Sequence, residues 1–174
     1  TYENVYLNQL GIHNISNALC AIAMADQIGI FTEKSIKALT TFPGVQRRMN
    51  LMKYGDAIII DDYAHHPTEI ENVLDTLKGF YPERKNCVIF QPPLFSRTQD
   101  FMNEFALVLS EFDEVVLLDI YPARELPISG ISAQVLLDKL NHSNKKLILK
   151  SAIKDSIDSS NAGLFAFLGA GDIG

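Results

Sequence analysis

The sequence has little of what marks a secreted, membrane-spanning or nucleic-acid-binding protein. Its 174 residues include only two cysteines, and lysine plus arginine number 15 against 21 aspartates and glutamates, for a net charge of −6. No apolar run approaches the roughly 20 residues that cross a bilayer, and the first residues lack the basic and apolar segments of a signal peptide. We therefore expect a cytoplasmic protein that binds neither nucleic acid nor a membrane surface.

Cys20 and Cys87 each lie in an apolar stretch of sequence. Unpaired cysteines in such surroundings typically behave as small buried hydrophobic residues in a reducing compartment. We expect both thiols to be buried, with no disulfide between them.

A phosphate-binding loop is also missing, because no Gly-x-x-x-x-Gly-Lys-[Ser/Thr] sequence occurs. The glycines of residues 169–174, Gly-Ala-Gly-Asp-Ile-Gly, match the spacing of a dinucleotide-binding turn. We reject that function and the dehydrogenase activity it would imply, since no helix and no acidic residue about 20 positions further on follow the turn. We expect the turn to bind an anion through its backbone N–H groups or to let two segments approach closely.

What the chain does have is a helical start followed by alternating strands and helices. Apolar residues recur at helical spacing over residues 14–29 and 32–41, where Thr32 is the expected N-cap, and Pro43 and Gly44 then break the pattern. We place a domain boundary there, between residues 1–42 and 43–174. In the second part, strands are expected at 47–53, 57–61, 87–91, 114–119, 146–149 and 164–168, and helices at 67–80, from Ser96 as N-cap through Leu109, and at 132–140.

Strands that alternate with helices of this length form right-handed βαβ units. We therefore predict an α/β fold with a Rossmann-like, mostly parallel sheet flanked by helices, preceded by a short helical piece. Ligands bind beyond the carboxyl ends of the strands in such sheets. Polar residues follow four of the expected strands, and we expect them to meet at that edge: residues 61–66, 91–97, 119–121 and 169–172.

The densest of these groups is residues 61–66, Asp-Asp-Tyr-Ala-His-His. A carboxylate after a strand can accept hydrogen bonds from ribose hydroxyls, a phenol can stack on a base, and an imidazole at a helix start can accept a proton. Zinc is disfavoured, because adjacent histidines do not share a face and no fourth ligand is apparent, so no metal site is predicted. The alternative is that the acids cap the following helix and the histidines lie on the surface.

Arg47, Arg48 and Arg97 are the candidate anion-binding side chains. The planar guanidinium group suits phosphate and carboxylate. Arg97 stands at the start of an expected helix, where a cation opposes the helix dipole, so a contact with a ligand would explain its position. Paired arginines are also ordinary on protein surfaces, and a structural role for Arg47 and Arg48 stays open.

Several stretches, in their order along the chain, resemble the Mur ligase family. Residues 11–18, Gly-Ile-His-Asn-Ile-Ser-Asn-Ala, are similar to a stretch near the end of the family's central domain, and Gln-Arg-Arg-Met at 46–49 is similar to the opening of its carboxyl-terminal domain. Residues 61–69, Asp-Asp-Tyr-Ala-His-His-Pro-Thr-Glu, resemble a signature of the members that add L-alanine. Further similarity follows at residues 90–92, 96–98, 119–125 and 169–173, whereas residues 141–162 resemble the family least.

The resemblance implies a bacterial ligase of peptidoglycan biosynthesis with three domains. This chain would hold the helical end of the central ATPase domain and most of the amino-acid acceptor domain. In the family, ATP with Mg²⁺ phosphorylates the carboxylate of UDP-N-acetylmuramic acid, and the amine of L-alanine attacks the acyl phosphate. The amino-terminal and central domains would be the partners of this chain, which alone should hold no cofactor tightly and show no turnover.

The resemblance also assigns site residues one by one. Asn14 and Asn17 match positions that meet adenine, and Asp62 and Tyr63 match contacts to the ribose region of ATP. Arg48 matches an arginine that helps to position the nucleotide. His65 and Arg97 match positions that face the acceptor amino acid and the sugar carboxylate. Together with Arg48 they are the expected catalytic residues.

One departure from the family and two alternatives complete the prediction. The family usually has Gln-Pro-His where this chain has Gln-Pro-Pro-Leu at residues 91–94, so Pro93 lacks a polar side chain and a backbone donor. The nearest alternative is the related ligase that attaches a recycled tripeptide to the same UDP-sugar and more often has Phe at the position of Tyr63. An alternative of another class is a non-catalytic nucleotide- or anion-binding module. As a ligase fragment, residues 1–42 should be loosely held, because their apolar helix faces would normally pack on another domain.

Overall fold

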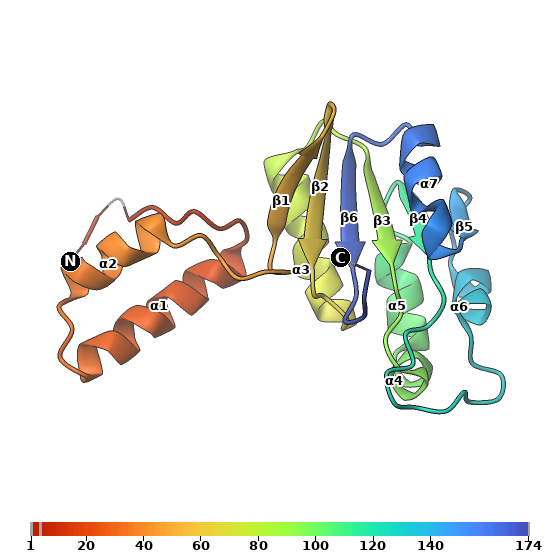
Figure 1. Ribbon diagram of the computed structural model, residues 1–174, viewed down its shortest axis with the longest axis horizontal. Helices are drawn as coiled ribbons and strands as arrows, with labels where there is room; N and C mark the ends of the chain where they lie inside the picture. The colour runs from red at the N-terminus through yellow and green to blue at the C-terminus, as the bar shows by residue number, and fades with distance from the viewer. Residues whose placement is uncertain (1, 4, 174) are drawn as a thin grey trace.

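The computed structural model describes residues 2–3 and 5–173, which form a helical hairpin and a layered α/β unit (Figure 1). The hairpin consists of α1 (Ile12–Gln27) and α2 (Thr32–Thr41) and lies beside the edge of the sheet that β1 (Asn50–Tyr54) forms. The α/β unit contains a six-stranded sheet with helices on both faces. The predicted α/β architecture, with a helical piece ahead of it, is confirmed.

The sheet is parallel except for its first strand. Strand β1 pairs antiparallel with β2, as a hairpin at residues 50–62, and every other pairing is parallel. The strand order is β1-β2-β6-β3-β4-β5, so the last strand of the chain lies inside the sheet. The remaining strands are β2 (Ala57–Asp62), β3 (Asn86–Phe90), β4 (Glu114–Leu117), β5 (Lys145–Leu147) and β6 (Leu164–Leu168).

Side chains of the central strands alternate between two hydrophobic layers. Along β3, Val88 and Phe90 belong to the larger layer, whereas Cys87 and Ile89 belong to the smaller one, as the two-residue period of a strand requires. In the larger layer the ring of Phe90 lies 5.3 Å from that of Phe105, centroid to centroid, and both side chains are fully buried. The larger layer is covered by α3 (Pro67–Phe80), α5 (Met102–Leu109) and α6 (Ala133–Lys139), and the smaller one by α7 (Ile153–Ser159).

Two N-caps expected from the sequence are wrong. Thr32 lies inside α2, whose N-cap is Phe31. The helix expected from Ser96 is two helices, α4 (Phe95–Asp100) and α5, which meet at Phe101. Both the hydroxyl and the N–H of Ser96 donate to the carboxylate of Glu125, at 2.5 and 3.0 Å. A long-range hydrogen bond therefore uses the side chain that the local pattern assigned to capping.

The sequence analysis also missed a helical segment before the last strand. Residues 150–159 form a short 3-10 turn, η1 (Lys150–Ala152), that continues into α7. Only Ile153 and Ile157 of α7 pack on the hydrophobic layer beneath it. Two apolar residues in a polar stretch are too weak a pattern to predict an amphipathic helix.

The helical hairpin exposes much of its apolar surface. Ala18 is the single residue of α1 that is buried. A hollow of about 700 Å³ opens on this face, lined largely by apolar side chains of the hairpin and of the segment that precedes α1, and by Phe80. Over the described residues, no helix has both the length and the apolar character needed to span a membrane. The large apolar side chains of α1 that are more than half exposed are Ile12, Ile15, Leu19 and Met24, and the C-cap residue Ile28 is exposed as well.

The expectation that both cysteines are buried is half right. Cys87 is 1% exposed in the sheet, whereas Cys20 is exposed on α1. Burial raises the pKa of the Cys87 thiol far above its ordinary value of 9.0. We predict that a thiol-reactive reagent such as DTNB labels Cys20 rapidly in the native chain, and Cys87 only when denaturant unfolds it. A Cys20→Ser variant is the control, and rapid native labelling of that variant would contradict the structure.

Candidate functional site

Loops that follow four strands meet at one edge of the sheet, as the sequence predicts. The N–H of Gln91, after β3, donates to the carbonyl of Leu168, at the end of β6, at 2.9 Å. The N–H of Leu94 donates to the carbonyl of Tyr121, after β4, also at 2.9 Å. Because β2 is parallel to β6, the segment after Asp62 begins at the same edge. This carboxyl edge is therefore a continuous rim built from segments far apart in sequence.

Backbone strain is concentrated at this rim. Among the described residues, four side-chain-bearing residues have a positive φ: Arg47 at 57°, Met49 at 50°, Leu94 at 43° and Ala123 at 50°. All four lie in loops at the carboxyl edge, because β1 runs antiparallel and its amino-terminal loop reaches the same edge. Such conformations cost about 1–3 kcal/mol each and cluster at functional sites. The strain thus singles out the same edge as the polar residues do.

Asp62 ties two rim segments together. Its carboxylate accepts hydrogen bonds from the N–H groups of Met49 and Ala64, both at 2.8 Å, and the residue is 5% exposed. Burial raises the pKa of Asp62 above its ordinary value, and these two backbone donors and the nearby Arg48 oppose the rise. Both carboxylate oxygens therefore already have partners within the chain, and the turn carrying Tyr63 is fixed by them.

Tyr63 forms an aromatic platform next to two cations. Its residue is 36% exposed. The guanidinium carbons of Arg47 and Arg48 lie 5.1 and 5.8 Å from its ring centroid, and the ring of His65 approaches edge-on at 5.0 Å. Arg48 is exposed, and its guanidinium has no hydrogen-bond partner among the described residues. This arrangement offers an aromatic face and a free positive charge to an anionic aromatic ligand.

The two histidines hold the start of α3. His66 is the N-cap: its Nδ1 accepts from the N–H of Thr68 at 3.3 Å, and the carboxylate of Glu69 accepts from the N–H of His66 at 3.2 Å. The Nδ1 of His65 lies 2.9 Å from the carbonyl oxygen of Tyr63, which leaves its Nε2 free for another partner. The alternative in which Asp61 and Asp62 cap this helix is wrong, because its N-cap is His66 and Glu69 completes the capping box. His65 and His66 are half-buried.

Arg97 lies on the same rim, in α4. The ring of His66 packs edge-on against that of Phe101 at 4.6 Å, and the N–H of Phe101 donates to the carbonyl of Arg97 one turn earlier. The hydrogen bonds from Ser96 lower the pKa of the Glu125 carboxyl, and the charge of Arg97 contributes to the shift. The structure thus brings the segments of Asp62, His65 and Arg97 to one side of the molecule.

The asparagines expected to meet adenine lie on α1, outside the α/β unit. The Nδ2 of Asn14 donates to the carbonyl of Leu10 at 2.7 Å, and that of Asn17 donates to the Oδ1 of Asn14 at 3.3 Å. The start of α1 is close to the rim, because His13 contributes to the pKa of Asp62. The rest of the helix runs away from the sheet (Figure 1), and Asn17 is exposed.

Sequence reasoning missed one cation of the rim, Lys150, and left another, Arg47, without a role. Lys150 forms an ion pair with Asp172 across a hollow of about 320 Å³ that Gln91 and Tyr121 also line. It belongs to the helical segment that the sequence pattern did not reveal. Arg47 was recognised as a candidate but had no role assigned, and its contacts with the glycine-rich turn depend on residues more than 120 positions away.

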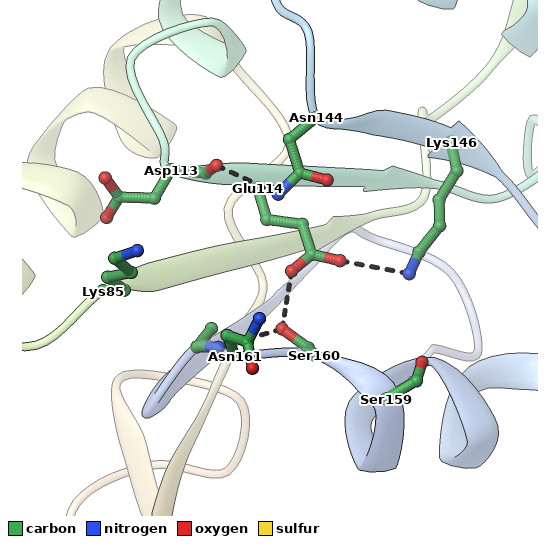
Figure 2. A pocket seen from close by; sticks show the side chains of 9 residues that line it. Lys85, Asp113, Glu114, Asn144, Lys146, Ser159, Ser160 and Asn161 are labelled. Carbon is green, nitrogen blue, oxygen red and sulfur yellow. Dashed lines mark hydrogen bonds and ion pairs between the residues drawn. The ribbon is translucent and has the colours of Figure 1, made fainter.

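The opposite, amino-terminal edge carries a polar hollow of about 350 Å³ (Figure 2). Glu114 lies at its centre, with 9% of its side chain exposed. Its carboxylate accepts from the Nζ of Lys146 at 3.0 Å and from the hydroxyl of Ser160 at 2.5 Å. Both oxygens are satisfied by the chain itself, so this network connects β4, β5 and the segment before β6.

The glycine-rich turn lets two segments approach closely, which is one of the two roles expected for it. A Cβ at Gly169 would lie 2.7 Å from the backbone oxygen of Gln91, and one at Gly171 would lie 2.3 Å from its Oε1. The carbonyls of both glycines accept hydrogen bonds from Arg47. Gly174, the last glycine of the pattern, lies outside the described residues.

Asp61 gives the rim a pH dependence that can be measured. Burial raises the pKa of this carboxyl above its ordinary 3.8, although Arg47 opposes the rise. From pH 3.8 upward the folded state holds a proton that the unfolded state has released, so the free energy of unfolding falls as pH rises through this interval. We predict that Asp61→Asn removes this component, so that the free energy of unfolding of the variant, measured with urea, decreases less as pH rises above 3.8. An unchanged pH profile would contradict the prediction.

Comparison of the sequence with known proteins shows the family to which the chain belongs. Residues 47–165 match the model of the family described as Mur ligase, glutamate ligase domain. The chain is 52% identical over 165 residues to a protein of Flavobacterium psychrophilum named UDP-N-acetylmuramate--L-alanine ligase, covering 94% of this chain and 37% of the relative. The chain thus spans little more than a third of the length of that relative.

Solved structures agree with this relationship. The structure of UDP-N-acetylmuramate-alanine ligase from Thermotoga maritima is similar, with a TM-score of 0.78 and 32% identity over 99% of this chain and 37% of that one. A murein peptide ligase from Psychrobacter arcticus is similar with a TM-score of 0.65 and 25% identity, over 96% of this chain and 36% of that one. With its rim, its sheet order and these similarities, the chain belongs to the Mur ligase family.

Proposed function

We propose that this chain is the acceptor-domain part of a longer, ATP-dependent ligase that joins L-alanine to UDP-N-acetylmuramic acid in peptidoglycan biosynthesis. The observation that carries the proposal is the 52% identity to a ligase of that name over 165 residues, which cover 94% of this chain. We assign the ligase to the bacterial cytoplasm, where its proposed substrates would meet.

The domain boundary proposed from the sequence has structural support. Residues 1–42 would be the helical end of the central ATPase domain, and residues 43–174 the acceptor domain. The apolar hollow of about 700 Å³ on the helical hairpin suits a surface that another part of a longer protein covers. The family model begins at residue 47, just after the proposed boundary.

Tyr63 and Arg48 are proposed to contact the nucleotide. The exposed ring and the free guanidinium stand side by side, 5.8 Å from centroid to guanidinium carbon, which suits stacking beside a negatively charged group. Asn14 and Asn17 would meet the adenine from α1. Asp62, whose oxygens accept from two backbone N–H groups, would act in the ribose region mainly by holding the turn that presents Tyr63.

His65 and Arg97 are proposed to face the acceptor amino acid and the sugar carboxylate. ATP with Mg²⁺ would supply the phosphoryl group that activates this carboxylate. The free Nε2 of His65 can accept a proton from the ammonium group of the attacking amino acid, and the guanidinium of Arg97 can stabilise negative charge that develops at the reacting carboxyl. With Arg48 they are the proposed catalytic residues of this chain.

The longer ligase should hydrolyse ATP in a manner that depends on both L-alanine and UDP-N-acetylmuramic acid, whereas this chain alone should not. Coupled measurement of ADP release tests both statements. Replacing L-alanine with the tripeptide separates this function from that of a murein peptide ligase, and faster turnover with the tripeptide would favour the latter. Tight ATP binding by the 174-residue chain in calorimetry would instead favour a non-catalytic nucleotide-binding module.

A further inference from the structure

The side chain of Arg47 connects the two ends of the α/β unit. Its Nη1 donates to the carbonyl of Gly171 at 2.6 Å, and its Nη2 donates to the carbonyl of Gly169. Arg47 precedes β1, whereas the glycines follow β6, which β2 separates from β1 in the sheet. The guanidinium of Arg47 therefore reaches past the end of β2 and holds the glycine-rich turn that follows β6.

The backbone of Arg47 is held as firmly as its side chain. Its φ of 57° is unfavourable for a residue with a side chain, so the surrounding contacts must maintain it. Its carbonyl accepts a hydrogen bond from the N–H of Tyr63 at 2.8 Å, and its guanidinium carbon lies 5.1 Å from the Tyr63 ring centroid. One residue thus contacts the platform of the proposed nucleotide site through both backbone and side chain.

The guanidinium of Arg47 already has hydrogen-bond partners within the protein. About a quarter of the Arg47 side chain is exposed, at 26%, and its Nε lies 3.7 Å from the Oδ1 of Asp61. Neither of these two buried atoms has a hydrogen-bond partner. A fork that donates to two carbonyls while stacking on an aromatic ring is geometry that lysine cannot reproduce.

We propose that Arg47 is a positioning residue: it ties the glycine-rich turn to Tyr63 and so sets the orientation of Tyr63 and Arg48 toward the nucleotide, without binding substrate itself. The kinetic part of this inference rests on the proposed function, whereas the structural part does not. Arg47 acts through Tyr63, because its Nη1 and Nη2 donate to the carbonyls of Gly171 and Gly169 and its Nε is buried.

Arg84 offers a matched control at the opposite edge of the sheet. Its Nη1 also donates to two backbone carbonyls, those of Asp56 at 2.9 Å and Gly163 at 3.1 Å. It contacts none of the rim residues among the described part of the chain. A lysine at this position should therefore weaken the same kind of bridge without affecting the rim.

In the longer ligase, Arg47→Lys should lower kcat/KM for ATP by roughly 10- to 100-fold, mainly through KM, since a misplacement of about 1 Å can cause the larger loss. Arg84→Lys should leave these constants unchanged, although thermal unfolding should show that both variants lose stability. Equal kinetic effects in the two variants, or none in Arg47→Lys, would overturn the proposal.

NMR of the 174-residue chain tests the contact independently of ligase activity. The ring resonances of Tyr63 should shift in Arg47→Lys and not in Arg84→Lys. In the wild-type chain, the guanidinium hydrogens of Arg47 should exchange with solvent far more slowly than those of the exposed Arg48. An unshifted ring or rapid exchange at Arg47 refutes the structural tie, whereas absence of L-alanine-dependent turnover in the wild-type ligase refutes only the proposed function.

Discussion

Alanine at Gly171 should lower the free energy of unfolding by about 3 kcal/mol, the upper range for overpacking a well-filled interior. The new Cβ would lie 2.3 Å from the Oε1 of Gln91 and 2.7 Å from the Cγ of Tyr121. Gln91 is 3% exposed and has little room to move, so the glycine-rich turn must shift away from β3. Urea denaturation of the chain, followed by far-ultraviolet circular dichroism, measures the loss.

Gly79 provides the control for this substitution. It lies in α3, and a Cβ there would meet nothing within 4 Å. Gly79→Ala should therefore raise the free energy of unfolding, by about 0.5–1 kcal/mol, because alanine is the better helix former. A Gly171→Ala variant as stable as the wild type would show that the rim packs more loosely than the structure indicates.

Loss of the Arg97 guanidinium should have the largest effect on turnover. Arg97→Met in the longer ligase should reduce kcat by about 100- to 1000-fold, the range for removal of one group that stabilises developing negative charge. The stability of the chain should change little, since no hydrogen bond of the Arg97 side chain occurs among the described residues. Steady-state kinetics with L-alanine varied measures the effect.

Arg84→Met controls for the loss of one positive charge in this experiment, because Arg84 lies at the opposite edge of the sheet. An Arg97→Lys variant should recover part of the activity if charge alone matters, and little if the planar fork is needed. Turnover of Arg97→Met within a few-fold of the wild type would remove Arg97 from the proposed catalytic residues.

The sequence pattern was sufficient to locate the rim. Continuous apolar runs such as residues 57–60 mark strands that are buried on both faces, and the polar residues after them must then collect at one edge. The strand at 164–168 was placed correctly, and the ends of the others were misplaced by up to three residues. The acidic run at residues 61–62 was correctly placed just ahead of α3, although it forms the end of β2.

Contacts between distant segments could not be predicted in this way. Nothing in the sequence near Ser96 indicates that the carboxylate of Glu125 accepts hydrogen bonds from both the hydroxyl and the N–H of Ser96. Likewise, nothing in the sequence near Arg47 indicates that Arg47 adopts a positive φ and reaches the glycine-rich turn. The exposure of Cys20 could not be predicted either. An apolar helix face indicates that something covers it, but the sequence does not tell whether that partner is part of this chain.

The position of β6 has a consequence for how this protein must be made. The ribosome synthesises residues 164–168 after the other five strands of this sheet. Those residues nevertheless lie between β2 and β3 and pair with both. Until they emerge, the nascent chain can hold only two half-sheets, each with an open edge that invites pairing with a neighbouring polypeptide. Completion of the sheet is therefore a late, long-range event, and premature termination before residue 164 should yield aggregates rather than a smaller domain.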